Sequence, residues 1–214
     1  MDEHFWINPL NLDEIDGNNP SIDKGSETRR QRSAECDPLE NINSFLRNAQ
    51  IAFDQIEDLK THMIEVQYPE IDPESLSSHR IEFLKVPEEL QTDNNEALKE
   101  VLHHLQKFAV ALFQILKEAE AIDKNDEYYK KLAMAKDKMV QMLGDIQLAI
   151  LISDLTPHQD VTYDMLPSHM RNKRGYSLRA LRDYMVIRDY SKFLQDVLEQ
   201  KDSLFGLKPL HSQH

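Results

Sequence analysis

The chain has 214 residues, a formal net charge of −13 and a hydrophobic content of 40%. That length fits one large domain, or one domain with tails. An acidic surface repels phosphate, which argues against nucleic acid and favours a basic or neutral protein partner, although many helical proteins are acidic without that consequence. The most apolar run, residues 146–152, falls far short of the roughly 18 residues that a membrane-spanning helix needs. We therefore expect neither nucleic-acid binding nor membrane insertion.

Four long amphipathic segments predict an all-α fold. The chain has 5 glycines and no alternating runs of β-branched and aromatic residues, so its composition does not indicate strands. Within each segment, apolar residues recur every three or four positions, which is typical of a helix with one buried stripe. In chain order the segments span residues 39–67, 96–122, 127–155 and 176–204.

The first segment carries signals at both of its ends. Asp37 stands where a capping side chain is preferred, and Pro38 occupies the first helical position, where proline is tolerated. At the other end, Pro69 disfavours helix at Tyr68. We therefore expect the first helix to begin after Asp37 and to stop at Tyr68.

The lengths of the connections predict the direction of each helix. Residues 123–126 form a short polar turn, which forces the second and third helices to lie antiparallel. Residues 69–95 and 158–175 are long enough for the chain to travel back and start again in the same direction. The pattern predicts an up-up-down-down four-helix bundle with long AB and CD crossover loops. Four apolar residues should hold the first crossover on the bundle: Ile81, Phe83, Leu84 and Val86.

Composition divides the chain into a bundle and two tails. Residues 1–38 are rich in Asn, Asp, Pro, Gly and Ser without periodicity, which predicts a flexible N-terminal tail. The bundle then covers 39–205, and 206–214 form a C-terminal tail. Arg29 and Arg32 lie in an Arg-Arg-Gln-Arg run, which is either a processing site for a furin-like protease or a solvated basic patch.

The sequence lacks the patterns of an enzyme. A four-helix bundle can hold two iron ions with two Glu-x-x-His motifs and two further glutamates. Only Glu100 to His103 matches, so we expect no metal, and we expect His103 and His104 at a polar edge. No glycine-rich phosphate loop, nucleophile elbow or Cys-x-x-Cys motif occurs. We therefore predict a protein without cofactor or catalytic residues.

Basic residues gather around the start of the fourth helix in an otherwise acidic chain. The helix macrodipole disfavours cations at this end, so helix stability does not explain them. Arginines beside apolar and aromatic side chains are typical of a protein-binding hot spot. Alternatively, the arginines only neutralise acidic neighbours such as Asp183. The predicted receptor-binding residues are Met170, Lys173, Arg174, Tyr176, Arg179 and Arg182.

Over residues 39–205 the chain resembles the interleukin-6 superfamily of long-chain helical cytokines, in its leukaemia inhibitory factor branch. The resemblance lies mostly in layout and in two stretches, His-Gln-Asp-Val-Thr-Tyr at 158–163 and Leu-Arg-Ala-Leu-Arg-Asp-Tyr at 178–184. Val86-Pro87 is also similar to the end of that family's AB loop. In that branch, a Phe-x-x-Lys pair at the start of the fourth helix contacts a receptor. Met170 and Lys173 lie nearest to that place, with methionine replacing phenylalanine.

The resemblance implies a secreted, monomeric cytokine that clusters class I cytokine receptor ectodomains, including a shared signalling receptor, and triggers JAK/STAT signalling. Three features of the sequence leave an alternative open. Cys36 is the single cysteine, no Asn-x-Ser/Thr acceptor is usable, and the first residues show no apolar leader segment. These features fit secretion without a classical leader, and they also fit a cytoplasmic helical scaffold or adaptor.

Overall fold

The computed structural model describes residues 5–7, 9, 37–87, 90, 93–171 and 175–207. Within these ranges every regular element is helical and no strand occurs, so the all-α prediction is confirmed. None of the helices in this part of the chain combines the length and the apolar character that crossing a bilayer demands.

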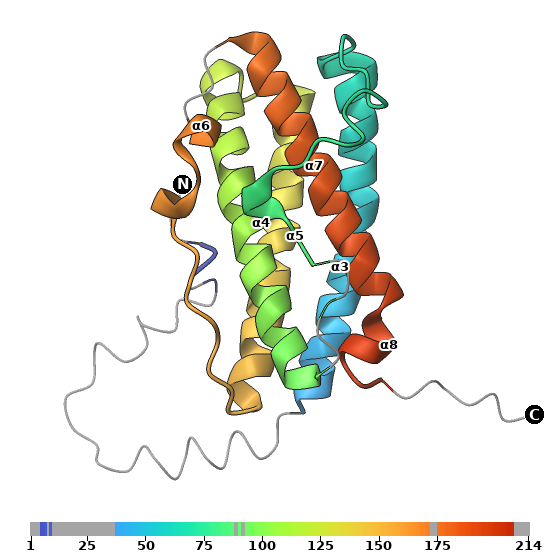
Figure 1. Ribbon diagram of the computed structural model, residues 1–214, viewed down its shortest axis with the longest axis vertical. Coiled ribbons are helices and arrows are strands. Elements are labelled where there is room, and N and C mark those ends of the chain that lie inside the picture. Colours follow the sequence, from blue (N-terminus) through green and yellow to red (C-terminus); the bar gives the residue numbers. More distant parts are fainter. Residues whose placement is uncertain are drawn as a thin grey trace, which may run out of the picture.

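Four long helices make up the body of the molecule (Figure 1). They are α3 (Pro38–His62), α4 (Asn94–Ile122), α5 (Glu127–Ile152) and α7 (Tyr176–Glu199). In Figure 1, α3 and α4 run from the bottom to the top, whereas α5 and α7 run from the top to the bottom. The short helices are α6 (Ser168–Arg171) and α8 (Lys201–Leu204).

The predicted ends of the helices agree with the observed ones to within a few residues. Asp37 caps α3, because its Oδ1 accepts a hydrogen bond from the backbone N–H of Leu39 at 2.9 Å. A π-helical turn, Met63–Gln67, continues α3, and the helix stops at Tyr68 as its Pro69 neighbour requires. Before α7, Gly175 adopts a φ of 98°, a conformation that favours glycine, and so sets the first residue of that helix.

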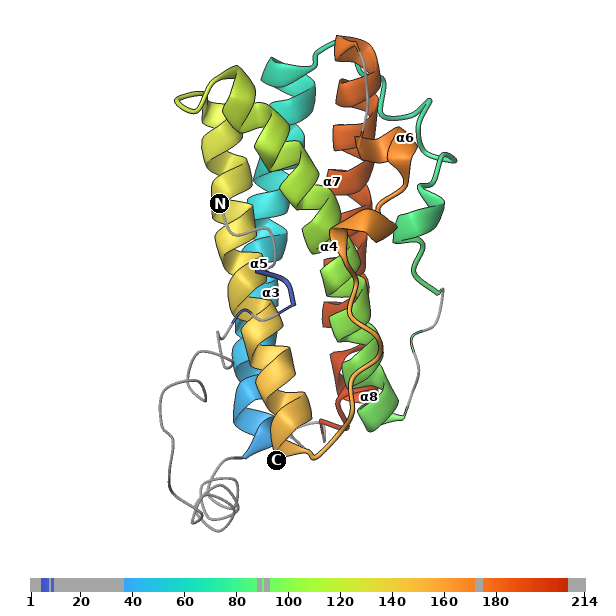
Figure 2. The same cartoon turned by 90° about the vertical axis from the view of Figure 1, so that its left-hand side faces the viewer.

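Both long connections pack on the side of the bundle formed by α4 and α7 (Figure 2). In the first connection Ile81 and Leu84 are buried, and Phe83 and Val86 pack against the core, as predicted. Arg188 of α7 donates hydrogen bonds to two carbonyl oxygens of this connection, those of Leu76 at 2.5 Å and His79 at 2.6 Å. In the second connection the buried residues are Val161, Leu166 and Met170.

The expected N-terminal tail is wrong for the described residues at its start. Phe5 and Trp6 are buried in the core, and the Trp6 ring lies 5.4 Å from that of Phe113 in α4. The Trp6 indole N–H donates to the carbonyl of Val161 at 2.7 Å, and the side chain of Gln106 donates to the Trp6 carbonyl at 3.2 Å. The indole therefore joins the N-terminal segment to both α4 and the second connection.

At the other end of the chain, the bundle extends slightly beyond its predicted limit. Phe205 is buried and packs edge-on against Phe45 with ring centroids 5.9 Å apart. Leu207 also packs against the core, so the expected C-terminal tail is wrong for that residue. Residues 208–214 lie outside the described ranges.

Candidate functional site

One end of the bundle brings together residues from α4, α5, α7 and the π-helical turn that continues α3. It is the end where α3 and α4 finish and α5 and α7 begin, at the top of Figure 1. A cavity of about 190 Å³ opens there between the helix ends. Its lining consists of Gln67, Tyr68, Glu118, Ala119, Ile122, Asp123, Asp126, Tyr128, Tyr176, Arg179 and Asp183. We call this the end cavity.

Two of the predicted receptor-binding residues lie at the mouth of the end cavity. Tyr176 is 50% exposed, and Arg179 lies one turn further along α7 and is partly exposed. The Tyr176 hydroxyl donates to the carbonyl of Gln67 at 2.8 Å, and this bond fixes the ring beside Tyr68. These two surface residues are available to a partner.

Two other predicted residues are interior, which corrects the prediction that they contact a receptor. Met170 and Arg182 are each only 2% exposed. The Met170 side chain packs into the core, and its carbonyl accepts a hydrogen bond from Arg182 Nη1 at 2.9 Å. The remaining predicted residues, Lys173, Arg174, Arg29 and Arg32, lie outside the described ranges.

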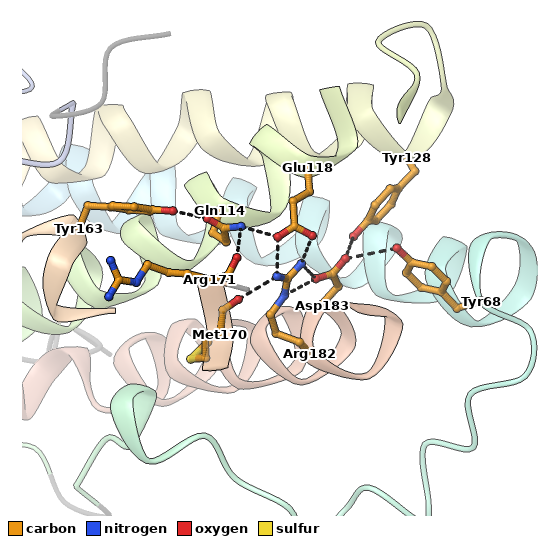
Figure 3. Close-up of polar contacts among 9 residues, drawn as sticks. All are labelled: Tyr68, Gln114, Glu118, Tyr128, Tyr163, Met170, Arg171, Arg182 and Asp183. Carbon is orange, nitrogen blue, oxygen red and sulfur yellow. Dashed lines mark hydrogen bonds and ion pairs between the residues drawn. The ribbon is translucent and has the colours of Figure 1, made fainter. Parts of the chain in front are cut away.

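Arg182 is held by carboxylates from two helices (Figure 3). Its Nη1 and Nη2 reach the two oxygens of Glu118 in α4 at 2.8 and 2.9 Å. Its Nε and Nη2 also donate to Oδ1 of Asp183, at 2.8 and 2.6 Å. For Arg182, the alternative interpretation is therefore the correct one, because this side chain neutralises acidic neighbours.

The second oxygen of Asp183 accepts hydrogen bonds from two phenols. Oδ2 lies 3.2 Å from the hydroxyl of Tyr68 and 3.3 Å from that of Tyr128. Burial raises the pKa of Asp183 to about 6, although the adjacent Arg182 guanidinium works in the opposite direction. Burial and the neighbouring carboxylate also raise the pKa of both phenols, so they remain hydrogen-bond donors at neutral pH. The floor of the end cavity is thus a fixed array of donors and acceptors.

Gln114 fastens the second connection to α4 beside this array. Its side-chain nitrogen donates to the carbonyl of Arg171 at 3.1 Å and also contacts a Glu118 oxygen. Its side-chain oxygen accepts a hydrogen bond from the hydroxyl of Tyr163. Together with the bond from Arg182 to Met170, these contacts hold both ends of the segment 163–171 against the bundle. Figure 3 shows the complete set of contacts.

A second polar group lies near the other end of α4. His103, His104 and His158 line a shallow depression, and the rings of His103 and His158 are 6.1 Å apart. His104 is buried against Phe193 of α7, so its expected position at a polar edge is wrong. Across the described ranges, no group of three or more His, Cys, Asp or Glu residues is arranged to hold a metal ion.

Sequence reasoning named Asp183 as an acidic neighbour of the arginines but missed Glu118 and the two phenols that donate to Asp183. One signal could have pointed to Glu118, because it lies three residues after Ile115 and four before Ile122, on the apolar stripe of α4. Because charges that leave water are paired in proteins, a carboxylate on such a stripe indicates a cationic partner. Nothing in the local pattern around Tyr68 or Tyr128 indicates that they share one acceptor.

Comparison with protein-family models, with curated protein sequences and with solved structures found no match for this chain.

Proposed function

We propose that this protein is a secreted helical cytokine with an up-up-down-down bundle, which binds and clusters class I cytokine receptors and thereby starts JAK/STAT signalling. The observation that carries the proposal is the course of the four long helices, with two rising and two descending in Figure 1. The connections between the rising pair and between the descending pair are both long and pack along the bundle. This layout is the one that the resemblance to the interleukin-6 superfamily implies.

The surface around the end cavity supports the proposal. Ile122 lines the cavity and is 68% exposed. Val66 precedes the lining residue Gln67 and is 63% exposed. Tyr176 and Leu178, at the start of α7, are each half exposed. Exposed apolar and aromatic side chains beside arginine are typical of protein-binding surfaces. The predicted basic residues Lys173 and Arg174 immediately precede this part of the chain.

The test is direct binding to a panel of class I receptor ectodomains by surface plasmon resonance. Arg179→Glu and Lys173→Glu should each weaken binding about tenfold or more, because a charge reversal at the edge of an interface creates like-charge contacts. Arg47→Glu is the matched control, since Arg47 is exposed in the first half of α3, away from the π-helical turn that reaches the end cavity. Circular dichroism should show unchanged helicity in all three variants.

Two results would contradict the proposal. The first is the absence of binding to every class I ectodomain at micromolar concentrations. The second is an equal loss of binding in Arg47→Glu and Arg179→Glu, which would indicate a nonspecific charge effect.

The alternative function is that of an intracellular helical scaffold or adaptor. The single cysteine and the absence of a usable N-glycosylation acceptor favour it. Expression of the untagged chain in cultured cells separates the two proposals. A cytokine should accumulate in conditioned medium, whereas a scaffold should stay with the cells.

A further inference from the structure

Three tyrosine rings form walls of the end cavity. The ring of Tyr68 lies 5.7 Å from that of Tyr128 and 5.5 Å from that of Tyr176, with interplanar angles of 74° and 68°. Rings from the residue after the π-helical turn, from the start of α5 and from the start of α7 therefore meet at steep angles around one space. Aromatic faces carry negative partial charge and attract cations.

The charged residues that line the same cavity are mostly acidic. Four carboxylates line it, against the single guanidinium of Arg179. Arg182 lies behind the floor and is shared between the two innermost carboxylates, so it does not balance all of them. The outer carboxylates belong to Asp123 and Asp126, in the turn between α4 and α5. The lining therefore favours a cation over an anion or a neutral group.

The size of the cavity limits what can enter it. Its volume of about 190 Å³ is below the roughly 300–1,000 Å³ of pockets that hold small-molecule ligands. A single long side chain of another protein is the appropriate size. Guanidinium is the better cation here, because it is planar, stacks on aromatic rings and offers several donors to carboxylates, whereas lysine offers a compact and strongly hydrated charge.

We infer that the end cavity receives an arginine side chain from the protein that this chain binds, with the guanidinium lying among the three tyrosines and facing Asp123 and Asp126. The inference deepens the proposed function, because it states the chemistry of the contact that a receptor makes at this end. The rest of the partner's contact would lie on Ile122 and Tyr176, which line the cavity, and on Val66, which precedes the lining residue Gln67; all three are exposed.

The experiment is an NMR titration of the full chain with the probe N-acetyl-arginine amide. The ring signals of Tyr68, Tyr128 and Tyr176 should shift in a saturable way, with a dissociation constant in the millimolar range that is expected for one side chain. N-acetyl-citrulline amide has the same shape without the charge, and N-acetyl-lysine amide has charge without the planar group. The affinity should follow the order arginine, then lysine, then citrulline.

A double variant tests the role of the outer carboxylates. Asp123→Asn with Asp126→Asn removes two charges and preserves local structure, because asparagine also caps helices and accepts the hydrogen bond that Asp123 receives from the N–H of Asn125. The arginine probe should bind this variant at least about fivefold more weakly. The matched control is Asp54→Asn with Asp137→Asn, which removes two exposed charges from α3 and α5 far along the bundle.

The outcomes distinguish this inference from the proposed function. Equal binding of the arginine and citrulline probes, equal weakening by the two double variants, or shifts that do not saturate would overturn the arginine site even if receptors bind. Saturable, charge-dependent binding of arginine alongside no receptor binding would uphold the site and refute the cytokine proposal.

Discussion

At the scale of single residues, the sequence predicted the burial of apolar side chains better than it predicted the burial of charged ones. Helical spacing placed Phe45, Leu105 and Ile146 correctly in the core. The concentration of basic residues around the start of α7 placed Arg182 in a receptor-binding surface, whereas its burial depends on Glu118, which lies 64 residues away on another helix. The position of Glu118 on the apolar stripe of α4 indicates a cationic partner, but local periodicity does not show that Arg182 is that partner.

His104 should make the protein sensitive to acid. Burial lowers its pKa from 6.5 to about 4. On acidification, the imidazole of His104 therefore binds a proton in the unfolded chain at a higher pH than in the folded chain. Between about pH 6.5 and pH 4 the unfolded state binds more protons, and the free energy of unfolding therefore falls as the pH falls. The loss attributable to His104 is at most about 3 kcal/mol.

The measurement is urea denaturation of the wild type, His104→Phe and His104→Gln at several pH values in that window. Both variants lack the titrating group and should lose less stability on acidification than the wild type. Parallel stability curves for all three proteins would show that another group is responsible. Comparing slopes across pH removes the effect that either substitution has on packing alone.

At the scale of elements, the sequence predicted the helices and their ends, but not what fixes the second connection to the bundle. The capping and proline signals around α3 were sufficient to predict where that helix begins and ends, because such signals act within a few residues. The segment 163–171 is instead held by Gln114 and Arg182, which belong to helices that precede and follow it. Contacts between separate elements of this kind become visible only in three dimensions.

Removal of Arg182 should destabilise the protein strongly. Arg182→Ala would leave the buried Asp183 and the partly exposed Glu118 without their cation, at a cost of about 3–5 kcal/mol. Arg182→Lys should cost less, because a charge remains although the bidentate contact with Glu118 is lost. Arg179→Ala, one turn earlier in α7 and partly exposed, is the control and should cost within about 1 kcal/mol.

Chemical denaturation of the three variants provides the comparison, with the second connection monitored by hydrogen exchange. Protection of Met170 and Arg171 amides should fall most in Arg182→Ala, since that connection loses its bond to α7. If Arg179→Ala and Arg182→Ala lowered the free energy of unfolding by similar amounts, the buried contacts of Arg182 would not contribute more to stability than a partly exposed arginine does.

At the scale of the whole molecule, Phe5 and Trp6, among the few described residues near the start of the chain, belong to the core rather than to a tail. The compositional bias of residues 1–38 concealed Phe5 and Trp6, because two aromatic residues in a polar stretch do not create periodicity. The structure uses them to fill space beside Phe113 and to join α4 to the second connection. The cooperative unit therefore begins more than thirty residues before α3.

Trp6→Ala should lower the free energy of unfolding by about 3–5 kcal/mol, because it opens a cavity and removes a buried hydrogen bond. Trp6→Phe keeps most of the ring contacts and should lose less. Since Trp6 is the single tryptophan of the chain, its fluorescence in the wild type reports directly on this site. Native emission typical of a solvated indole, or a loss below about 1 kcal/mol in Trp6→Ala, would be inconsistent with the packed segment.

Because Trp6 is buried in the core, proteolytic cleavage at Arg32 would affect the stability of the bundle. A protease acting there would separate the indole covalently from the four helices, yet the nicked protein would retain it through its hydrogen bond to Val161 and its contact with Phe113. What had been an intramolecular contact would become a bimolecular one, and it would lose the high effective concentration that the intervening chain provides. Dilution would then release the fragment and weaken the core. After such a cut, the free energy of unfolding would depend on the protein concentration, as it does not in the intact chain.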